Sequence, residues 1–282
     1  MIKMTCQEIQ NVSLEILKHL DSFFRSHNLR YFLEAGTLLG AVRHKGFIPW
    51  DDDADIVMPR QDYERFVREY VDSKDYKLFE PSRDNSWLPY ARVCEMKKTY
   101  FKQVVKWTNA GDEPGVGIDI FPLDGAPDSV EQYDSFQAKV VRVRDELWKL
   151  RSAASGKGSK EFRRDIFGFL KDCVHCATRW FRRLNFRWLL KRSMKKFRRL
   201  CLTYPYETSN HCFYIAVVTG RRRFWQRKWF SDAVYLDFCG EKFPAPIGYE
   251  ERLVADYGDW RTPPPETERT THESSQTMWW RD

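Results

Sequence analysis

A short acidic run near residue 50 carries the side chains best suited to chemistry. Asp51, Asp52, Asp53 and Asp55 have apolar residues on both sides, which would anchor them at the edge of a packed sheet. In an extended chain alternate side chains point the same way, so Asp51, Asp53 and Asp55 are expected to share one face. Carboxylates packed this closely repel one another unless cations lie between them or water surrounds them. The run therefore predicts a site for Mg²⁺ or Mn²⁺, with a solvated acidic loop as the alternative.

Asp119 is a further candidate ligand, although it lies far along the chain. It is embedded between two isoleucines in a strand-like apolar segment. A carboxylate in such a place is costly to bury unless it meets a cation or a metal. We therefore expect Asp119 to join the acidic run. Asp124 follows, and we expect it to form a turn, the alternative being an acid that supports the site.

A turn of small residues precedes the acidic run. Gly36 and Thr37 follow an apolar run, which predicts a strand, a tight turn with exposed backbone amides and then a short helix. Such a turn at the start of a helix, with Arg or Lys nearby, suits a pyrophosphate. We expect Gly36 and Thr37 to bind substrate phosphates. Arg43 and Lys45 either join them or only offset the carboxylates.

The segment 36–66 resembles the LicD family of phosphotransferases. Members of that family transfer phosphocholine or related phospho-alcohols from a CDP-linked donor to a glycan. The family is similar in turn to the nucleotidyltransferase fold, in which a Gly-Ser or Gly-Thr turn precedes an Asp-x-Asp strand and a later strand supplies a third carboxylate. The turn at 36–37, Asp53 with Asp55, and Asp119 stand at the matching positions.

Other stretches carry the same resemblance. They are IDIFPLD at 118–124 and, toward the C-terminus, FPAPIGYEERL and YGDWRTPPP. The resemblance implies that Arg92, which is followed by Thr99, contacts the donor, and the alternative is an edge-strand arginine that is merely solvated. Ala54 departs from the family pattern, where a larger aliphatic residue is usual. The segment 151–212 is not covered by the resemblance.

The activity that the resemblance implies is metal-dependent phosphotransfer. A phospho-alcohol, with phosphocholine favoured, would pass from a CDP-alcohol donor to a sugar hydroxyl of a glycan or lipid-linked glycan, with release of CMP. Asp53, Asp55 and Asp119 are the expected catalytic residues, and with Asp51 they would hold one or two Mg²⁺. Two alternatives stay open. One is a nucleotidyltransferase that releases pyrophosphate, and the other is a non-catalytic protein that binds membranes or polyanions.

Hydrophobic periodicity and the resemblance together predict an α/β (α+β) fold, with a nucleotidyltransferase-like mixed sheet flanked by helices and a basic helical insertion. Helices are expected over 5–27, 38–44, 59–72 and 128–150, and strands over 30–33, 51–58, 76–79, 90–105, 115–125, 213–219 and 234–238. Small residues at 152–159 predict a flexible connection. We divide the chain into a catalytic core (1–150), a basic helical region (151–212), the C-terminal part of the catalytic domain (213–265) and a poorly ordered tail (266–282).

The net charge of +7 is concentrated in one region. Between residues 151 and 202 there are sixteen Lys and Arg and three acids, and apolar residues recur there at helical spacing. They are Phe162, Ile166, Leu170, Cys173, Ala177, Trp180, Leu184, Leu190, Met194, Phe197 and Cys201. Basic amphipathic helices of this kind contact anionic membranes or polyanions, so we expect an anionic membrane surface at 160–200. The alternative is a lobe that packs its apolar face on the core. We expect no nucleic acid partner, because no RNA-binding motif accompanies the charge.

A second basic run, Gly220-Arg221-Arg222-Arg223, lies between the last two expected strands. It is a candidate for a second anion contact.

Compartment signals favour the cytoplasm. No apolar run approaches the ~18 residues of a membrane span, and no basic-then-apolar leader opens the sequence. The seven cysteines have no disulfide-framework spacing, and we interpret the Cys173-Val174-His175-Cys176 run as buried thiols rather than a zinc site. We therefore expect a cytoplasmic protein that is either free or peripheral on the inner face of the membrane.

Overall fold

The computed structural model describes residues 2–83, 86, 88–102, 113–154, 186–214, 223–269 and 277–282. Its helices are α1 Cys6–Ser26, α2 Ala35–His44, α3 Arg60–Glu69, α4 Val130–Ala154, α6 Phe186–Cys201 and α7 Tyr249–Tyr257. Its strands are β1 Phe32–Leu33, β2 Asp55–Pro59, β3 Tyr76–Phe79, β4 Ala91–Glu95, β5 Thr99–Lys102, β6 Gly117–Ala126, β7 His211–Phe213, β8 Trp225–Gln226, β9 Ala233–Phe238, β10 Glu241–Pro246 and β11 Thr277–Trp280. Short 3₁₀ turns lie at Pro81–Arg83, Arg227–Phe230 and Glu266–Glu268.

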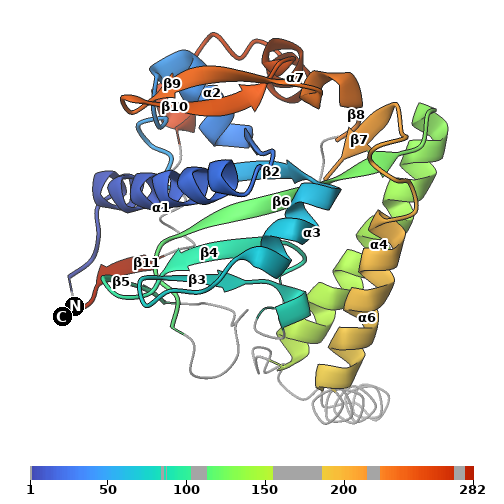
Figure 1. Cartoon of the computed structure of the whole chain (residues 1–282), viewed down its shortest axis with the longest axis horizontal. Coiled ribbons are helices and arrows are strands. Elements are labelled where there is room, and N and C mark those ends of the chain that lie inside the picture. Colours follow the sequence, from blue (N-terminus) through green and yellow to red (C-terminus); the bar gives the residue numbers. More distant parts are fainter. Residues whose placement is uncertain are drawn as a thin grey trace, which may run out of the picture.

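The main sheet is mixed, as the sequence predicted. Its strand order is β1-β2-β6-β4-β3, with β7 and β8 added beyond the end of β6 (Figure 1). β2 and β6 run parallel, whereas β1 pairs with β2, β4 with β6 and β3 with β4 in the antiparallel sense. β2 and β6 are therefore central strands, and their residues are almost all buried.

Helix α1 covers the sheet with its apolar face. Ile16, Leu20 and Phe24 on that face are fully buried, and the Thr5 hydroxyl caps the helix by accepting from the backbone N–H of Glu8. Phe24 packs edge to face against Phe66 of α3, with 5.1 Å between ring centroids. α1 and α3 thus lie side by side, so the helix that precedes β1 packs against the helix that follows β2.

The C-terminal elements join the N-terminal ones in a single core. β9 and β10 form an antiparallel hairpin that packs against β1 and α2, and α7 follows it (Figure 1). Phe238 and Phe243 of the hairpin belong to the same apolar cluster as Phe32 of β1. The segments that resemble one family at the two ends of the chain are therefore one packed unit.

The described part of the basic region packs as a helix pair. α6 lies along α4, and Leu190, Phe197 and Cys201 are buried there as the spacing predicted. α4 continues to Ala154, so the connection expected at 152–159 begins later than predicted. Met194 is partly buried against the same cluster. Residues 155–185, with the other seven residues of the predicted apolar face and the Cys173–Cys176 run, lie outside the described residues.

Two predicted boundaries near the acidic run are wrong. Helix α2 already begins at Ala35, so Gly36 and Thr37 lie in its first turn rather than before it. β2 begins only at Asp55, because the preceding residues are held by other contacts. The Gln10 side-chain amide of α1 donates to the carbonyl of Asp51 at 2.7 Å and to that of Ile48 at 3.1 Å, which removes these carbonyls from strand pairing.

The strand predicted over 90–105 is divided in two. β4 ends at Glu95, whose carboxylate accepts from the backbone N–H groups of Lys97, Lys98 and Thr99 at 2.6–2.8 Å. These bonds close a turn, and β5 then leaves in a different direction to pair with β11. An acid that caps a turn inside a strand-like run gives no periodicity signal.

Part of the segment 266–282, for which poor order is expected, forms a strand. Thr277–Trp280 forms β11, antiparallel to β5, and Met278 is buried. The indole N–H of Trp280 donates to the Glu8 carboxylate of α1 at 3.1 Å. Burial of apolar surface and strand pairing together order this segment.

The described helices contain no stretch that is both long and apolar enough to cross a membrane.

Candidate active site

Asp55 and Asp119 lie opposite each other on the two parallel central strands. The register pairs their Cα atoms, and the backbone N–H of Asp119 donates to the carbonyl of Ala54 at 3.2 Å. The backbone N–H of Asp55 donates to the Thr37 hydroxyl at 2.8 Å, so α2 fixes the start of β2. The predicted third carboxylate therefore meets the acidic run, although 64 positions separate the two residues.

Asp51 completes the acidic cluster from the α2 side. A Cβ atom at Gly36 would lie 2.2 Å from Asp51 Oδ2, so the carboxylate rests where any other residue would put a side chain. Exposure alternates along the run as predicted, although 51–54 is not a strand. Asp51, Asp53 and Asp55 are partly exposed, whereas Asp52 and Ala54 are buried. We call Asp51, Asp53, Asp55 and Asp119 the acid cluster.

The acid cluster is electrostatically strained. Burial raises the pKa of Asp55 well above its usual range, and the charges of Asp53, Asp119 and Asp51 raise it further. Burial also raises the pKa of Asp119, while the Arg92 charge and a hydrogen bond from Tyr90 act in the opposite direction. The cluster is thus a place where negative charge accumulates and a cation would be favoured.

The side chains do not stand in a metal-binding arrangement in the described structure. Among the residues that it covers, no three His, Cys, Asp or Glu side chains form a group that could hold an ion as they are placed. The donor type nevertheless fits a hard divalent cation, because every member of the acid cluster offers carboxylate oxygens. Buried Asp119 Oδ1 makes no hydrogen bond within the described residues, although Arg92 lies 3.2 Å away.

Arg92 lies inside the sheet and faces the acid cluster. It sits on β4, between β6 and β3, opposite Asp119 in the register, and is 7% exposed. Its Nη1 pairs with Asp119 Oδ1 at 3.2 Å. The alternative of a solvated edge-strand arginine is therefore wrong. Tyr90, which lies just before the same strand and which no sequence pattern singled out, also bonds Asp119.

The structure does not bring Arg43 and Lys45 to the turn at Gly36. Both lie at the far end of α2, and the ten-residue helix is about 15 Å long. Arg43 Nη1 donates to the carbonyl of Trp260 at 3.0 Å, which ties the helix to the C-terminal segment. Lys45 is exposed, adopts a left-handed backbone conformation (φ 58°) and ends the helix. Phosphate contact by either residue stays a prediction.

Arg223 is a cation of the site that sequence spacing did not assign individually. Its guanidinium stacks on Tyr214, 4.4 Å from the ring centroid, and its charge lowers the pKa of Asp55. Arg223 Nη1 is buried and has no hydrogen-bond partner within the described residues. The other three residues of the basic run, 220–222, lie outside the described residues, so the anion contact expected of that run stays a prediction.

The acid cluster lies in a part of the chain that matches a known protein family. Residues 28–148 match the family model described as LicD/FKTN/FKRP, nucleotidyltransferase domain. Those residues are a LicD-family domain. The chain is also 29% identical to the lipopolysaccharide cholinephosphotransferase LicD of Haemophilus influenzae, over 96% of this chain and 97% of that protein. An uncharacterized protein of Rickettsia prowazekii is 46% identical over 48 residues, which are 17% of this chain and 18% of that protein.

The LicD-family domain contains the acid cluster, Gly36, Thr37 and Arg92, whereas Arg223 lies outside the matched range. The resemblance seen in the sequence is thus confirmed.

A buried ion pair joins the LicD-family domain to α7. Glu34, the residue before α2, is fully buried and pairs with Arg252 Nη2. Its backbone N–H donates to the carbonyl of Asp55 at 3.0 Å, and its carboxylate accepts from the Tyr214 hydroxyl at 3.2 Å. The backbone that carries Asp55 therefore depends on contacts from residues beyond 200.

Asp124 does not form a turn, and that prediction is wrong. It lies within β6, is 2% exposed, and pairs with Arg60 through two bonds of 2.6 and 2.7 Å. The pair lies at the other end of the central strands from Asp119. Asp124 is therefore a buried partner for Arg60 at the start of α3.

Proposed function

We propose that the chain is a LicD-type phosphotransferase that moves a phospho-alcohol, phosphocholine above all, from a CDP-linked donor to a sugar hydroxyl of a cell-surface glycan or glycolipid. The name of the Haemophilus relative supports phosphocholine as the transferred group and lipopolysaccharide as the acceptor. The observation that carries the proposal is the meeting of the acid cluster with Arg92 at one end of two parallel strands.

Mg²⁺, or Mn²⁺, is the proposed cofactor. Asp51, Asp53, Asp55 and Asp119 would hold it, since mutual repulsion within the acid cluster favours a bound cation. When bound, such an ion neutralises charge on a pyrophosphate and on a leaving phosphate.

The remaining roles belong to the chain's own side chains. The acceptor oxygen would attack the phosphorus that bears the alcohol, and the bond from that phosphorus to the CMP oxygen would break. Asp55 or Asp119 would take the proton of the acceptor hydroxyl. Arg92 would orient Asp119, and Arg223 would face the donor phosphates, because a guanidinium suits phosphate oxygens.

Contact with an anionic membrane surface through 160–200, and a cytoplasmic location, belong to the same proposal. Of that range the structure describes 186–200, the greater part of α6. Trp188 on this helix is 59% exposed and lies under Arg192, with 5.4 Å from the guanidinium carbon to the ring centroid. Exposed Trp beside Arg and Lys is typical of helices that lie at a membrane interface.

The decisive experiment follows CMP release from CDP-choline, CDP-ribitol and CDP-glycerol, with lipopolysaccharide as acceptor, in Mg²⁺ and in EDTA. We expect release from one donor, its loss in EDTA, and a fall of about a thousandfold in Asp53→Ala. Asp237→Ala is the matched control, because Asp237 is exposed on β9 and pairs only at the surface with Lys242, at 3.1 Å.

The products separate this proposal from nucleotidyl transfer. Attack on the phosphorus next to the nucleoside would release phosphocholine in place of CMP, and a nucleoside triphosphate donor would yield pyrophosphate. Either product as the main one would overturn the proposal. So would CMP release that is equal in wild type and Asp53→Ala.

A further inference from the structure

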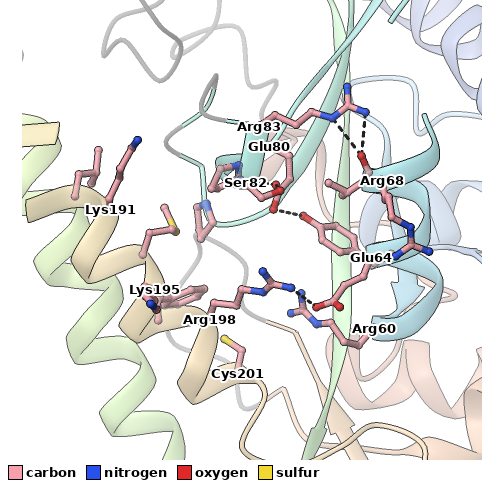
Figure 2. Close-up of a pocket in the computed structure, with 17 residues that line it drawn as sticks. Arg60, Glu64, Arg68, Glu80, Ser82, Arg83, Lys191, Lys195, Arg198 and Cys201 are labelled. Carbon is pink, nitrogen blue, oxygen red and sulfur yellow. Dashed lines mark hydrogen bonds and ion pairs between the residues drawn. The ribbon is translucent and has the colours of Figure 1, made fainter. Parts of the chain in front are cut away.

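A cavity of about 790 Å³ lies between α3, α6 and the loop that follows β3. Figure 2 shows α6 as one wall and α3 as the opposite wall, with Glu80 and Ser82 of the loop between them. Arg198 of α6 reaches across to Glu64 of α3, with 2.7 Å from Nη2 to Oε1. The two walls are thus joined at one end by an ion pair.

The cavity is distinct from the acid cluster. Asp55 begins β2, whereas Arg60, which lines the cavity, follows its last residue, so about 16 Å of strand separates them. None of the acid cluster lines the cavity. A ligand bound here would not occupy the proposed donor site.

Cations dominate the polar part of the lining. They are Arg60, Arg68, Arg83, Lys191, Lys195 and Arg198, against the two carboxylates of Glu64 and Glu80. The four arginines are all in ion pairs: Arg60 with Asp124, Arg198 with Glu64, Arg83 with Asp72 and Arg68 with Glu69. Lys191 and Lys195, one turn apart on α6, are exposed at the rim. Exposed ammonium groups at the rim suit an anion at the mouth of the cavity.

The inner part of the lining is apolar. Leu190 and Phe197 of α6 and Tyr63 of α3 are buried, and Val67 and Met194 line the same space from the two helices. A volume of this size is that of a small-molecule site. A cavity with cations at its mouth and hydrocarbon inside is complementary to a molecule that has an anionic head and an alkyl chain.

We propose that this cavity binds one anionic membrane phospholipid, with its phosphate at Lys191 and Lys195 and one acyl chain between Val67, Met194 and Phe197. The occupant is a lipid because inorganic phosphate would make no use of the apolar walls, and a neutral hydrocarbon would make no use of the two lysines at the rim. The inference needs no residue of the proposed transfer reaction. It gives α6 a specific lipid site in addition to a general attraction to anionic surfaces.

The test is calorimetric titration of the full chain with dihexanoyl phosphatidate below its micelle-forming concentration, without any nucleotide donor. Inorganic phosphate and dihexanoyl phosphatidylcholine are titrated in parallel. We expect phosphatidate to bind at least about tenfold more tightly than either comparison ligand, because only phosphatidate offers both a net negative head and a chain.

Two neighbouring lysines give a matched pair of variants. Lys195→Glu changes a cation that lines the cavity, whereas Lys196→Glu changes one that instead pairs with Glu146 of α4 at 3.7 Å. Both variants alter the net charge equally. We expect Lys195→Glu to weaken phosphatidate binding about tenfold and Lys196→Glu to leave it within about twofold. Lys195→Arg should restore it.

The apolar part is tested separately. Met194→Trp would fill the space between the helices, so it should abolish phosphatidate binding while leaving weak phosphate binding unchanged. Circular dichroism checks that this variant is folded, and Lys195→Glu tests the site without altering the packing. Absence of phosphatidate binding, equal losses in the two lysine variants, or phosphate binding as tight as that of phosphatidate would each overturn the proposal.

Discussion

Asp51 rests against the first turn of α2 because residue 36 has no side chain. A methyl group at that position would lie 2.2 Å from Asp51 Oδ2, so Gly36→Ala must displace the Asp51 carboxylate. We expect transfer activity to fall about a hundredfold, because small misplacements of site groups cost that much. Thermal unfolding should change little, since the carboxylate is partly exposed and can move toward solvent. Steady-state CMP release and a melting curve measure both effects.

A double-mutant cycle checks that Gly36→Ala acts through Asp51. If it does, adding Gly36→Ala to Asp51→Ala should cost little further activity, because the displaced group is already absent. Additive losses would mean that the glycine acts elsewhere, for example on the backbone amides of the turn.

Arg223 should matter to the donor, because its charge acts to lower the pKa of Asp55 and its buried Nη1 lacks a hydrogen-bond partner within the described residues. We expect Arg223→Ala to lower kcat/KM for the CDP-alcohol about a hundredfold, with a larger effect on KM for the donor than for the acceptor. Arg223→Lys should recover part of the loss, since it keeps the charge but not the planar fork.

Lys228→Ala is the control for Arg223, because Lys228 is an exposed cation a few residues further along the same chain segment. Equal effects in Arg223→Ala and Lys228→Ala would remove Arg223 from the site and leave only general attraction of an anionic donor.

Individual site residues could be predicted from the sequence where the chemistry allows only a few residue types. Asp53, Asp55 and Asp119 stand out because several acids in apolar surroundings are costly without a cation. Arg43 was a weaker inference. It is near Gly36 in the sequence, but the two residues lie at opposite ends of helix α2. Strand register brings Tyr90 to Asp119, and the return of the chain brings the charge of Arg223 near enough to act on Asp55. Neither arrangement leaves a local pattern in the sequence.

Helix α1 contacts the far edge of the sheet through His19. Its ring stacks on Tyr76 of β3 with 4.4 Å between centroids, and Nε2 lies 3.0 Å from the Tyr70 hydroxyl. Burial lowers the pKa of His19 below its usual value near 6.5. Below that pH the unfolded chain therefore binds the proton more readily than the folded one, so stability falls as the pH decreases.

We expect His19→Phe to keep the stacking and remove this titration. Urea unfolding from pH 7 to pH 5 should show a smaller loss of stability in the variant than in wild type. The difference should be under about 1 kcal/mol, because the imidazole is only half buried and solvent screens its charge. Parallel pH profiles for the two proteins would show that other groups cause the acid sensitivity.

The elements themselves were predicted best where apolar residues repeat regularly. α1, α3, β3, β6 and β9 appear close to their expected places, because burial of one face or of a whole strand leaves a pattern in the sequence. The boundaries of α2 and β2 were missed because side-chain bonds from Gln10 and Thr37, rather than periodicity, determine them. β11 was missed because its partner β5 lies far away in the sequence.

The molecule as a whole is held together by contacts between its two ends. The LicD-family domain ends at 148, yet Glu34, which precedes the helix of the site, has partners at Tyr214 and Arg252. The Trp280 indole likewise bonds Glu8 of α1. These contacts between the two ends explain why stretches that resemble the LicD family occur near both ends of the chain. We therefore expect the C-terminal segment to be needed for the stability of the catalytic core.

Arg252→Met tests this expectation directly. The guanidinium is 2% exposed, pairs with Glu34 and, at 2.5 Å, with Asp256, and lies 3.7 Å from the centroid of the Trp225 ring. Its removal would leave the Glu34 carboxylate buried without its cation, which costs about 3–5 kcal/mol of the free energy of unfolding. Urea denaturation measures the loss, with Arg261→Met as the control because its pair with Glu250 is exposed.

A second substitution in the Glu34–Arg252 ion pair distinguishes the loss of charge balance from the loss of packing. Glu34→Gln in the Arg252→Met background removes the uncompensated charge and should restore about half of the lost stability, because a neutral buried amide is far less costly than a carboxylate. Activity should recover with it, since the Glu34 backbone holds the carbonyl of Asp55. If Arg252→Met lowers the free energy of unfolding no more than Arg261→Met does, by under about 1 kcal/mol, then the catalytic core does not depend on its ion pair with α7.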